Sequence, residues 1–374
     1  MEKIAIVTSG HPPFDERIFY KLAKSFVKKG FSVSIICSTY PSNLIKDDIT
    51  IIGFTGEKLT KREKISKLTF ELEQTQPDLI ICCEPLTILA AKRFTRSLQK
   101  KINICYDITE WYPENVASKI KGLKKIFSYL ILFLFNIYVS NLTDILIFGE
   151  KLKRRRYEFI APGKKIIMIE YYPVLEYFRF IPKINDGKSI TLAYTGLITV
   201  ERGILNVINA IKLLAERNPE LNITFKIIGK FLTETEEKIV KDELDSLKQI
   251  QVILQNWVDY NDLSMQLSEV DICLELREKT FIFNNSLPIK LFDFLASGKT
   301  IIYSDIKAIK NEIDISEFGF LVDPKDYPSI AAIIENYISH PDILKKHSEK
   351  ARKAAEQKYN WESVENKLLK LIKE

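Results

Sequence analysis

The sequence predicts an α/β protein made of two doubly wound domains, each built on a parallel sheet. Short apolar runs with strand character alternate with amphipathic helical segments along most of the 374 residues. This length exceeds what one hydrophobic core comfortably serves, which favours two domains. Residues 171–187 lack periodicity and are rich in proline and turn residues, so they predict a linker. We expect an N-terminal domain over 1–178, a C-terminal domain over 179–358, and a last helical segment, 359–374, that packs back on the N-terminal domain.

Composition narrows the class of protein. The hydrophobic fraction of 46% and charged fraction of 28% are those of a globular chain, and a net charge of +6 gives no argument for a nucleic-acid partner. Three histidines and cysteines without CxxC spacing predict no metal site. The five cysteines fall in or beside predicted buried strands, as expected of reduced thiols in a cytoplasmic protein. The chain enters a strand directly after Met-Glu-Lys, and we expect no signal peptide.

In the N-terminal half, the alternation starts at once. Lys3–Thr8 (KIAIVT) predicts a strand, and the loop after it ends at Asp15, which can cap a helix that runs to Gly30. We expect residues 107–115 to form a polar, aromatic loop. Further strands are predicted at 31–37, 49–54, 78–83, 102–106 and 166–170, and further helices at 59–76 and 86–99.

The most apolar stretch is 126–139 (IFSYLILFLFNIYV). About fourteen residues are too few to span a bilayer, which takes roughly twenty. The sequence favours a helix buried in the N-terminal domain. A second interpretation is a helix at a membrane surface, because Lys121, Lys124 and Lys125 precede it, where anionic lipid attracts positive charge. The basic run 151–156 (KLKRRR) fits either the same surface or a solvated helix end.

The C-terminal half repeats the alternation without evident sequence similarity to the first half. A last amphipathic helix is predicted at 361–372. The predicted strands are 190–194, 223–228, 251–254, 271–276, 300–303 and 319–322, and the predicted helices are 204–217, 235–247, 260–268, 289–297, 328–340 and 341–358.

Residues 284–298 (NNSLPIKLFDFLASG) lie between two of these strands. We expect a helix that begins near Asn285, carries Pro288 in its first turn and ends at the final glycine. Lys290 and Asp293 lie three residues apart and so share a face. A cation for phosphate and a carboxylate for sugar hydroxyls suit a nucleotide-linked ligand at a helix N-terminus, whereas an ordinary capped helix of a βαβ unit fits the spacing equally well.

The loop 195–203 (TGLITVERG) opens directly onto a predicted helix. Gly196 and Gly203 permit close backbone approach, and Arg202 offers a planar positive group for a diphosphate. An exposed arginine at a helix start is the simpler explanation of the loop alone. Parallel strands end at one edge of a sheet, so Arg202 and Lys290 are expected to approach the same ligand, in a cleft between the domains.

A series of segments in the C-terminal half has the order and spacing of a known family's motifs: TGLITVERG, IIGK, NWVDYNDLSMQLSEVDICL, NNSLPIKLFDFLASGKTIIYSD, EFGFLVDPKD and YNWESV. Two N-terminal segments agree with them: GHPPFDERIFYKLAKSFVKKGFSVSIIC and YDITEWYPENV. Together they resemble the retaining GT-B glycosyltransferases, the glycosyl transferases group 1, a family that contains sucrose synthase and phosphatidylinositol mannosyltransferases.

The resemblance implies two Rossmann-like domains facing a deep cleft, and transfer of a sugar from a nucleoside diphosphate to an acceptor with retention of configuration. No metal or other cofactor is implied. Arg202 falls at the family's basic residue for the donor diphosphate. Asp293 falls where a glutamate binds the ribose, and Asn285 where the first glutamate of that pair stands. The donor site implied is Gly196, Arg202, Asn285, Ser286, Leu287, Pro288, Lys290 and Asp293.

Such chemistry depends on stabilising the leaving diphosphate and aligning the acceptor. We expect Arg202 and Lys290 to stabilise the diphosphate. A structural role at the helix start fits His11 equally well, and capping fits Asp15 better than a role as a base. The residues expected to orient or polarise the acceptor are His11, Asp107 and Glu110, with Asp15 and Arg17 in the acceptor loop.

Three positions depart from the family pattern. Leu197 stands where many members have a second basic residue, and Thr109 where the related loop often has histidine. Asn285 and Asp293 replace the glutamate pair. These departures leave open a catalytically silent binding subunit, and a nucleotide-sugar epimerase shares the two-domain fold.

The main expectation is a cytoplasmic glycosyltransferase of cell-surface glycan synthesis. Its partners would be a nucleotide sugar and a lipid-linked or polysaccharide acceptor, with no nucleic acid. Its N-terminal domain would lie peripherally at the inner face of an anionic membrane. Neither the sugar nor the base of the donor follows from the sequence.

Overall fold

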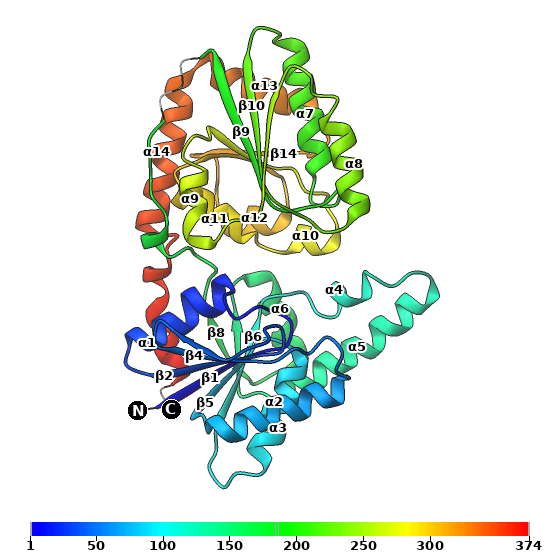
Figure 1. Ribbon diagram of the computed structural model, residues 1–374, viewed down its shortest axis with the longest axis vertical. Coiled ribbons are helices and arrows are strands. Elements are labelled where there is room, and N and C mark those ends of the chain that lie inside the picture. The colour runs from blue at the N-terminus through cyan, green and yellow to red at the C-terminus, as the bar shows by residue number, and fades with distance from the viewer. Residues whose placement is uncertain (1, 184, 186, 373–374) are drawn as a thin grey trace. The chain divides into compact units, whose positions relative to one another are not determined.

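The computed structural model describes residues 2–183, 185 and 187–372 (Figure 1). Residues 184 and 186 of the predicted linker, and residues 373 and 374, therefore lie outside the described part of the chain.

The chain forms two compact α/β units. The N-terminal unit comprises residues 1–171 and 361–374, and the C-terminal unit comprises residues 172–360. The sequence-based boundary at 178 lies seven residues after the change of unit at Tyr171. Both units confirm the predicted class of fold, a mostly parallel sheet covered by helices.

Eight strands form the sheet of the N-terminal unit, in the order β3-β4-β2-β1-β5-β6-β7-β8. Neighbouring strands pair in parallel, except that β3 and β4 are antiparallel. The strands are β1 (Lys3–Thr8), β2 (Ser32–Cys37), β3 (Leu44–Lys46), β4 (Ile49–Gly53), β5 (Leu79–Cys82), β6 (Asn103–Ile108), β7 (Ile145–Phe148) and β8 (Lys165–Met168).

Helices connect these strands and bury apolar side chains against them. Ile80, Phe94 and Leu146 are examples from the strands and helices of this core, each fully buried. The helical segments are the π-helical η1 (Glu16–Ala23), α1 (Lys24–Lys28), α2 (Lys61–Thr75), α3 (Pro85–Arg96), α4 (Glu114–Ala117), α5 (Leu123–Asn141) and α6 (Lys151–Ile160).

Strands β3 and β7 are absent from the sequence-based assignment. β3 has three residues at the edge of the sheet. β7 is a continuous apolar run of four residues, ILIF, that follows an apolar helix, so hydrophobic periodicity does not separate the two. In addition, β6 extends to Ile108, so Asp107 belongs to a strand and not to the predicted loop.

The apolar helix α5 corrects the favoured sequence interpretation. It has 19 residues and extends away from the sheet at the edge of its unit (Figure 1). Its buried residues are Asn136, Val139 and Ser140, all near its C-terminal end. Most of its large apolar side chains are exposed or only half-buried, so the prediction of a buried helix is wrong. The exposed residues and their exposed fractions are Leu123 86%, Ile126 62%, Phe127 69%, Leu130 55%, Ile131 52%, Leu134 66% and Tyr138 52%.

The C-terminal unit contains an all-parallel sheet of six strands, in the order β11-β10-β9-β12-β13-β14. Its core includes Tyr194, Ile211 and Leu274, each fully buried. The strands are β9 (Ser189–Ile198), β10 (Asn222–Phe231), β11 (Gln251–Gln255), β12 (Ile272–Glu275), β13 (Thr300–Ser304) and β14 (Gly319–Val322). The helical segments are η2 (Leu175–Tyr177), α7 (Ile204–Arg217), α8 (Glu234–Leu244), η3 (Tyr260–Asp262), α9 (Leu263–Gln266), α10 (Phe281–Asn285), α11 (Ile289–Ala296), α12 (Lys307–Glu312), α13 (Tyr327–Ser339) and α14 (Pro341–Gln357).

The last segment of the chain returns to the N-terminal unit. It forms two 3₁₀ turns, η4 (Trp361–Ser363) and η5 (Glu365–Leu371), where the sequence predicts one amphipathic helix. Trp361 is buried, and its indole Nε1 donates a hydrogen bond to Ser25 Oγ at 2.8 Å.

In each sheet, the next strands along the chain lie on one side of the first strand, and later strands lie on its other side. The place where the side changes is the switch point of the sheet. In the N-terminal unit that point lies between β1 and β5, and in the C-terminal unit it lies between β9 and β12. Ligands of open α/β sheets bind beyond the carboxyl ends of the strands at such a point. The loops that follow these four strands are therefore the places to look for function.

Candidate active site

Three cationic side chains gather beyond the carboxyl ends of β9 and β12. Arg202 follows β9, Arg277 comes two residues after β12, and Lys290 lies in the first turn of α11. Together with Glu275, the last residue of β12, they form what we name the cation cluster. The sequence pointed to Arg202 and Lys290 but not to Arg277 or Glu275.

Glu275 holds two of these cations in place. Its carboxylate is fully buried and accepts hydrogen bonds from Arg277 Nε at 2.6 Å and from Lys290 Nζ at 2.5 Å. The hydroxyl of Tyr303 donates to the same carboxylate at 3.2 Å. Burial alone would raise the pKa of Glu275, but the charges of Arg277 and Lys290 lower it to about 2. Glu275 is therefore ionised at neutral pH and fixes both partners.

The cation cluster has a surplus of positive charge, because three cations face one carboxylate. Burial lowers the pKa of Lys290 to about 8, against the attraction of Glu275. The pKa of Arg202 is lowered by burial and by the nearby guanidinium of Arg277. The guanidinium carbons of Arg202 and Arg277 lie 5.6 and 5.5 Å from the ring centroid of Phe283. A bound anion would relieve this mutual repulsion, so the cluster has the electrostatics of an anion site.

Two glycines keep the backbone close to these side chains. Gly203 has φ +82° and caps α7, and a Cβ there would overlap the carbonyl oxygen of Leu276, directly after β12. Gly196 has φ +102°, and a Cβ there would overlap the ammonium of Lys290, which also donates to the carbonyl of Thr195. Close packing of neighbouring segments therefore explains both glycines.

The segment 284–298 differs from its prediction in where the helix begins. Asn285 is the last residue of the short helix α10, whose first turn is capped by the hydroxyl of Thr280. The Nδ2 of Asn285 donates a hydrogen bond to the carbonyl of Phe281 at 2.7 Å. Helix α11 begins only after Pro288, which is extended (φ −77°, ψ 123°). Asn285 thus belongs to a preceding short helix, and α11 begins at Ile289, as in the predicted range 289–297.

The remaining predicted donor residues surround this break. Ser286 is the C-cap residue of α10, and Leu287 is buried. Asp293 lies three residues after Lys290 in α11 and is 3% exposed. Its ribose-binding role stays a prediction.

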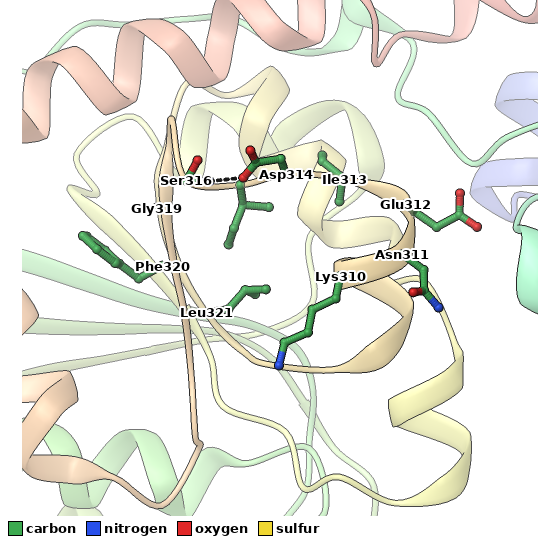
Figure 2. Close-up of a pocket in the computed structure, with 10 residues that line it drawn as sticks. Lys310, Asn311, Glu312, Ile313, Asp314, Ser316, Gly319, Phe320 and Leu321 are labelled. Carbon is green, nitrogen blue, oxygen red and sulfur yellow. Dashed lines mark hydrogen bonds between the residues drawn. The ribbon is translucent and has the colours of Figure 1, made fainter.

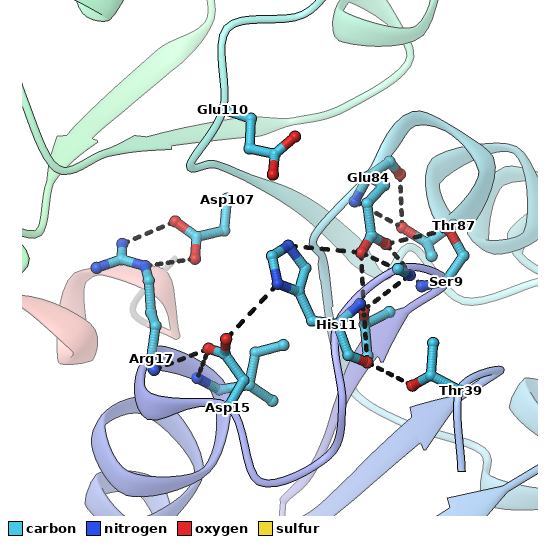
Figure 3. A network of polar contacts seen from close by, with 12 residues as sticks. Ser9, His11, Asp15, Arg17, Thr39, Glu84, Thr87, Asp107 and Glu110 are labelled. Carbon is cyan, nitrogen blue, oxygen red and sulfur yellow. Dashed lines mark hydrogen bonds and ion pairs between the residues drawn. The ribbon is translucent and has the colours of Figure 1, made fainter. Parts of the chain in front are cut away.

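In the N-terminal unit, Glu84 organises the loop after β1 (Figure 3). Its Oε1 accepts from Thr8 Oγ1 at 2.7 Å and from Gly10 N at 3.0 Å, and its Oε2 accepts from Ser9 N at 2.7 Å. Glu84 follows β5, so one carboxylate joins the ends of the two strands between which the sheet switches direction.

His11 lies between two carboxylates (Figure 3). Its Nδ1 is 3.6 Å from Asp15 Oδ2, and its Nε2 is 3.8 Å from Glu84 Oε1. Burial alone would lower the pKa of His11, but Asp15, Glu84 and Glu110 together raise it to about 9. His11 is thus a cation at neutral pH, able to donate a hydrogen bond but not to act as a base. Asp15 also caps η1 through the amides of Arg17 and Ile18, as expected.

Asp107 and Arg17 form an ion pair with each other. Arg17 donates to both oxygens of Asp107, from Nε at 2.6 Å and from Nη2 at 2.7 Å, and its Nη1 donates to the carbonyl of Ile169 at 3.1 Å. Both side chains are buried. This buried bidentate pair holds η1 against β6. The predicted contact of Asp107 and Arg17 with an acceptor stays a prediction.

Glu110 remains available in the same region. Its side chain is exposed and accepts a hydrogen bond from Asn115 Nδ2. The carbonyl of neighbouring Thr109 accepts from the buried ammonium of Lys153. The basic run 151–156 is thus used partly inside the unit, since Arg156 also forms a bidentate pair with Glu114 at 2.6 and 2.7 Å.

One cavity of the C-terminal unit lies away from the predicted site residues, and no metal-binding cluster is found in the described part of the chain. A hollow of about 570 Å³ lies between α12 and β14 (Figure 2). Its lining includes Lys310, Asp314 and Phe320, and it contains none of the predicted site residues. Within the described ranges, no group of three or more His, Cys, Asp or Glu side chains is arranged to hold a metal ion.

The two units define a class of protein, an α/β protein of the GT-B type, which here carries the cation cluster at the switch point of its C-terminal sheet. Solved structures of this class match the whole chain. Sucrose-phosphate synthase from Thermosynechococcus elongatus has a TM-score of 0.78 at 13% identity, with 100% of this chain and 98% of that chain covered. WaaG, a glycosyltransferase involved in lipopolysaccharide biosynthesis, has a TM-score of 0.73 at 14% identity, with 99% of each chain covered. HepE of Anabaena, solved in complex with UDP, has a TM-score of 0.71 at 11% identity, with 100% and 99% covered.

The family follows from the sequence comparison. Residues 176–370 match the family model of the glycosyl transferases group 1, so the chain belongs to that family and is a glycosyltransferase. No curated protein matches the chain. The resemblance stated from the motifs is thereby confirmed.

Proposed function

We propose that this glycosyltransferase moves a sugar, with retention of anomeric configuration, from a nucleoside-diphosphate sugar to a lipid-linked or polysaccharide acceptor of cell-surface glycan synthesis. The observation that carries the proposal is the cation cluster, with three cations and one carboxylate where β9 and β12 end. The complex of the Anabaena neighbour with UDP agrees with a diphosphate ligand in this fold.

The cluster suits the chemistry of the donor. When the bond from the sugar to the diphosphate breaks, negative charge grows on the leaving phosphate oxygens. Fixed cations stabilise that charge without reorganising, which lowers the barrier. In our proposal Arg202 and Arg277 bind the diphosphate, Lys290 approaches the phosphate bonded to the sugar, and Asp293 binds the ribose. Leu197 stands where many family members have a second basic residue. In our proposal Arg277 takes over that role, because it supplies the second guanidinium for the diphosphate.

On the acceptor side, His11 and Glu110 are proposed to bind acceptor hydroxyls. The charged imidazole is a donor, and the Glu110 carboxylate is an acceptor. No metal or other cofactor is needed in this proposal, since the charge of the leaving group is met by side chains. Activity that persists in excess chelator is the expected result.

The test is nucleotide binding followed by transfer. UDP, GDP, ADP and TDP, and their sugars, are each added to the full chain, and unfolding temperature is recorded. One base is expected to stabilise the protein selectively. Arg202→Ala and Arg277→Lys should each weaken that nucleotide at least about tenfold, since one charge-assisted contact is worth roughly 1.5–3 kcal/mol. The matched control is Arg217→Ala, an exposed arginine of the same unit.

With the selected sugar nucleotide and a membrane extract as acceptor source, NMR of the product should show the anomeric configuration of the donor. Unchanged nucleotide binding in both arginine variants contradicts the donor site. Free sugar and nucleotide formed at the same rate with and without acceptor would indicate an epimerase instead.

We further propose that α5 lies on the inner face of an anionic membrane. By length and composition, this helix could cross a membrane. Only 17% of its most apolar 18-residue stretch is buried inside the protein. Its C-terminal end is anchored in the unit, where Asn136 donates to the carbonyl of Tyr112 at 3.1 Å and accepts from Tyr157 at 3.2 Å. An interfacial position leaves these contacts intact, whereas a span would break them.

Vesicle binding tests this position. Charge reversal at Lys121, Lys124 and Lys125 should weaken binding to anionic vesicles by on the order of 100-fold or more, from about 1 kcal/mol per lysine. Charge reversal at three exposed lysines of the C-terminal unit, Lys212, Lys238 and Lys248, changes net charge equally and serves as the control. Equal losses in both triple variants, or no loss in the first, would rule out docking through α5.

A further inference from the structure

A second cavity, of about 640 Å³, lies entirely within the N-terminal unit. It is bounded by α5, by the first turns of α2 and α3, and by the loops after β1 and β6. Its volume falls in the roughly 300–1,000 Å³ range of small-molecule sites. We name it the α5 pocket.

The α5 pocket is apolar along one side. Ile65 of α2, Leu86 and Leu89 of α3, and Leu132 and Phe135 of α5 line it. These five side chains are half-buried, and Ile65, Leu89 and Phe135 among them also pack against the buried core of the unit. Covering these side chains with a hydrocarbon chain would remove apolar surface from water, which is favourable.

The opposite side is polar and belongs to the switch point between β1 and β5. His11, Glu84 and Glu110 line it. Glu84 and Asp15 flank the imidazole of His11 (Figure 3). One cation thus faces several carboxylates, so this end repels an anionic group and favours neutral hydroxyls.

The pocket is continuous with the exposed face of α5. Ile131 lines the pocket and is also 52% exposed. Phe127 and Leu134, one turn to either side of Ile131, belong to the exposed apolar stripe. Hydrocarbon that lies along α5 can therefore enter the pocket without crossing polar surface.

We propose that the α5 pocket binds the hydrocarbon chain of a neutral glycolipid acceptor, whose sugar hydroxyls lie against His11 and Glu110. The inference rests on the glycosyl transfer proposed above and specifies its acceptor: a lipid, not a soluble polysaccharide, with an uncharged head next to the polar end. The chain extends from the pocket over Ile131 toward the membrane-facing stripe.

The first test uses the unaltered full chain and alkyl glucosides below their micelle concentrations. Calorimetry compares methyl, hexyl and octyl β-glucoside. Each buried methylene should lower the Kd about fourfold, from the transfer of hydrocarbon out of water. An octyl glucoside that carries a diazirine on its chain should label the pocket residues Leu86, Leu89, Leu132 and Phe135. Equal Kd values across the series, or labelling confined to Phe127 and Leu134, would overturn the proposal.

Octyl phosphate tests the nature of the head. It has the same chain with an anionic group, and it should bind at least about tenfold more weakly than octyl glucoside. Tighter binding of the phosphate would refute the neutral head.

A pair of variants localises the chain. Leu132→Trp fills the pocket, whereas Leu134→Trp places the same bulk on the exposed stripe, where Leu134 is 66% exposed. Leu132→Trp should weaken octyl glucoside at least tenfold and leave methyl glucoside unchanged, and Leu134→Trp should leave both unchanged. Nucleoside diphosphate binding should be normal in both variants, which reports intact folding of the donor site.

The outcomes separate this inference from the proposed transfer. If the labelled chain occupies the pocket but no acceptor is glycosylated, the pocket stands and the transfer proposal fails. If methyl and octyl glucosides are glycosylated with equal kcat/KM and neither labels the pocket, the transfer stands and the lipid pocket fails.

Discussion

At the scale of single residues, two carboxylates organise the candidate sites. Glu275 fixes Arg277 and Lys290, and Glu84 fixes the loop that carries His11. Glu275 ends β12 and Glu84 follows β5, and each of these strands flanks a switch point. Neither stands out in the sequence, because a glutamate at a strand end has the same spacing whether it binds a loop, a cation or solvent.

Replacement of Glu275 by glutamine should destabilise the C-terminal unit. The change removes the negative charge of a fully buried carboxylate and leaves Arg277 and Lys290 to repel each other, at a cost of about 3–5 kcal/mol. Denaturant unfolding measures it. Glu317→Gln, at an exposed partner of Lys350, is the control and should leave stability unchanged. A variant Glu275→Gln as stable as the parent chain would show that the cluster is not electrostatically coupled.

The carboxylates around His11 predict that its imidazole loses its proton at a pH well above the usual range for histidine. Its pKa is raised from 6.5 to about 9, so its ion pair with Asp15 contributes stability below pH 6.5, and that contribution is lost as pH rises through about 9. NMR titration of the imidazole should show the high midpoint, and Asp15→Asn should move it down toward 6.5. His347, whose pKa is lowered by burial and by Lys350 and Lys346, provides the internal comparison. A His11 midpoint at or below that of His347 would disprove the ion-pair geometry.

At the scale of elements, the loops after β9 and β12 are held together by backbone packing. Gly203 touches the backbone of Leu276, so the arginines on either side, Arg202 and Arg277, keep a fixed separation. By contrast, the fully buried residues of α5 all lie near its C-terminal end, and its exposed stripe can contact lipid or substrate.

Substitution of Gly203 by alanine tests this packing. Gly30 is the matched control, because it has a similar φ of +86° but a Cβ added there would meet no atom within 4 Å. Gly30→Ala should cost about 1–2 kcal/mol for the left-handed backbone alone. Gly203→Ala should cost clearly more, since the backbone at Leu276 must shift, and should also weaken nucleotide binding by moving Arg202. Equal unfolding free energies for the two variants would argue against a rigid loop pair.

At the scale of the whole molecule, the chain leaves its first unit at Tyr171 and returns to it at Trp361. The N-terminal unit is therefore complete only after the last residues are made. Trp361 is 2% exposed, and its partner Ser25 lies in α1.

Truncation of Trp361 to alanine should destabilise the N-terminal unit by about 3–5 kcal/mol, through lost apolar burial and a cavity. Hydrogen exchange, read unit by unit, should show lost protection in β1, β8 and α1 and unchanged protection in β9 and β12. Ser25→Ala removes only the hydrogen-bond partner of the indole and should cost about 1–3 kcal/mol. Loss of protection confined to the C-terminal unit would contradict the placement of the last segment.

Much of the architecture follows from local sequence. Alternating apolar runs, helix caps such as Asp15 and stop residues such as Gly298 act over a few residues, so periodicity and capping locate most strands and helices. Arg202 and Lys290 could be predicted as site residues in the same way, because each lies in a loop or at a helix start with a recognisable pattern. The family was accessible because many weak motifs occur in one order.

What the sequence left open depends on contacts between distant segments. Whether α5 is buried is decided by which helices cover it, and its composition is the same in either case. That Asp107 pairs with Arg17, ninety positions away, depends on the packing of η1 against β6. The partnership of Glu275 with Arg277 and Lys290, and the pocket beside α5, likewise arise only when the sheet order brings strand ends together. Local pattern specifies the elements, whereas burial and charge pairing depend on three-dimensional proximity.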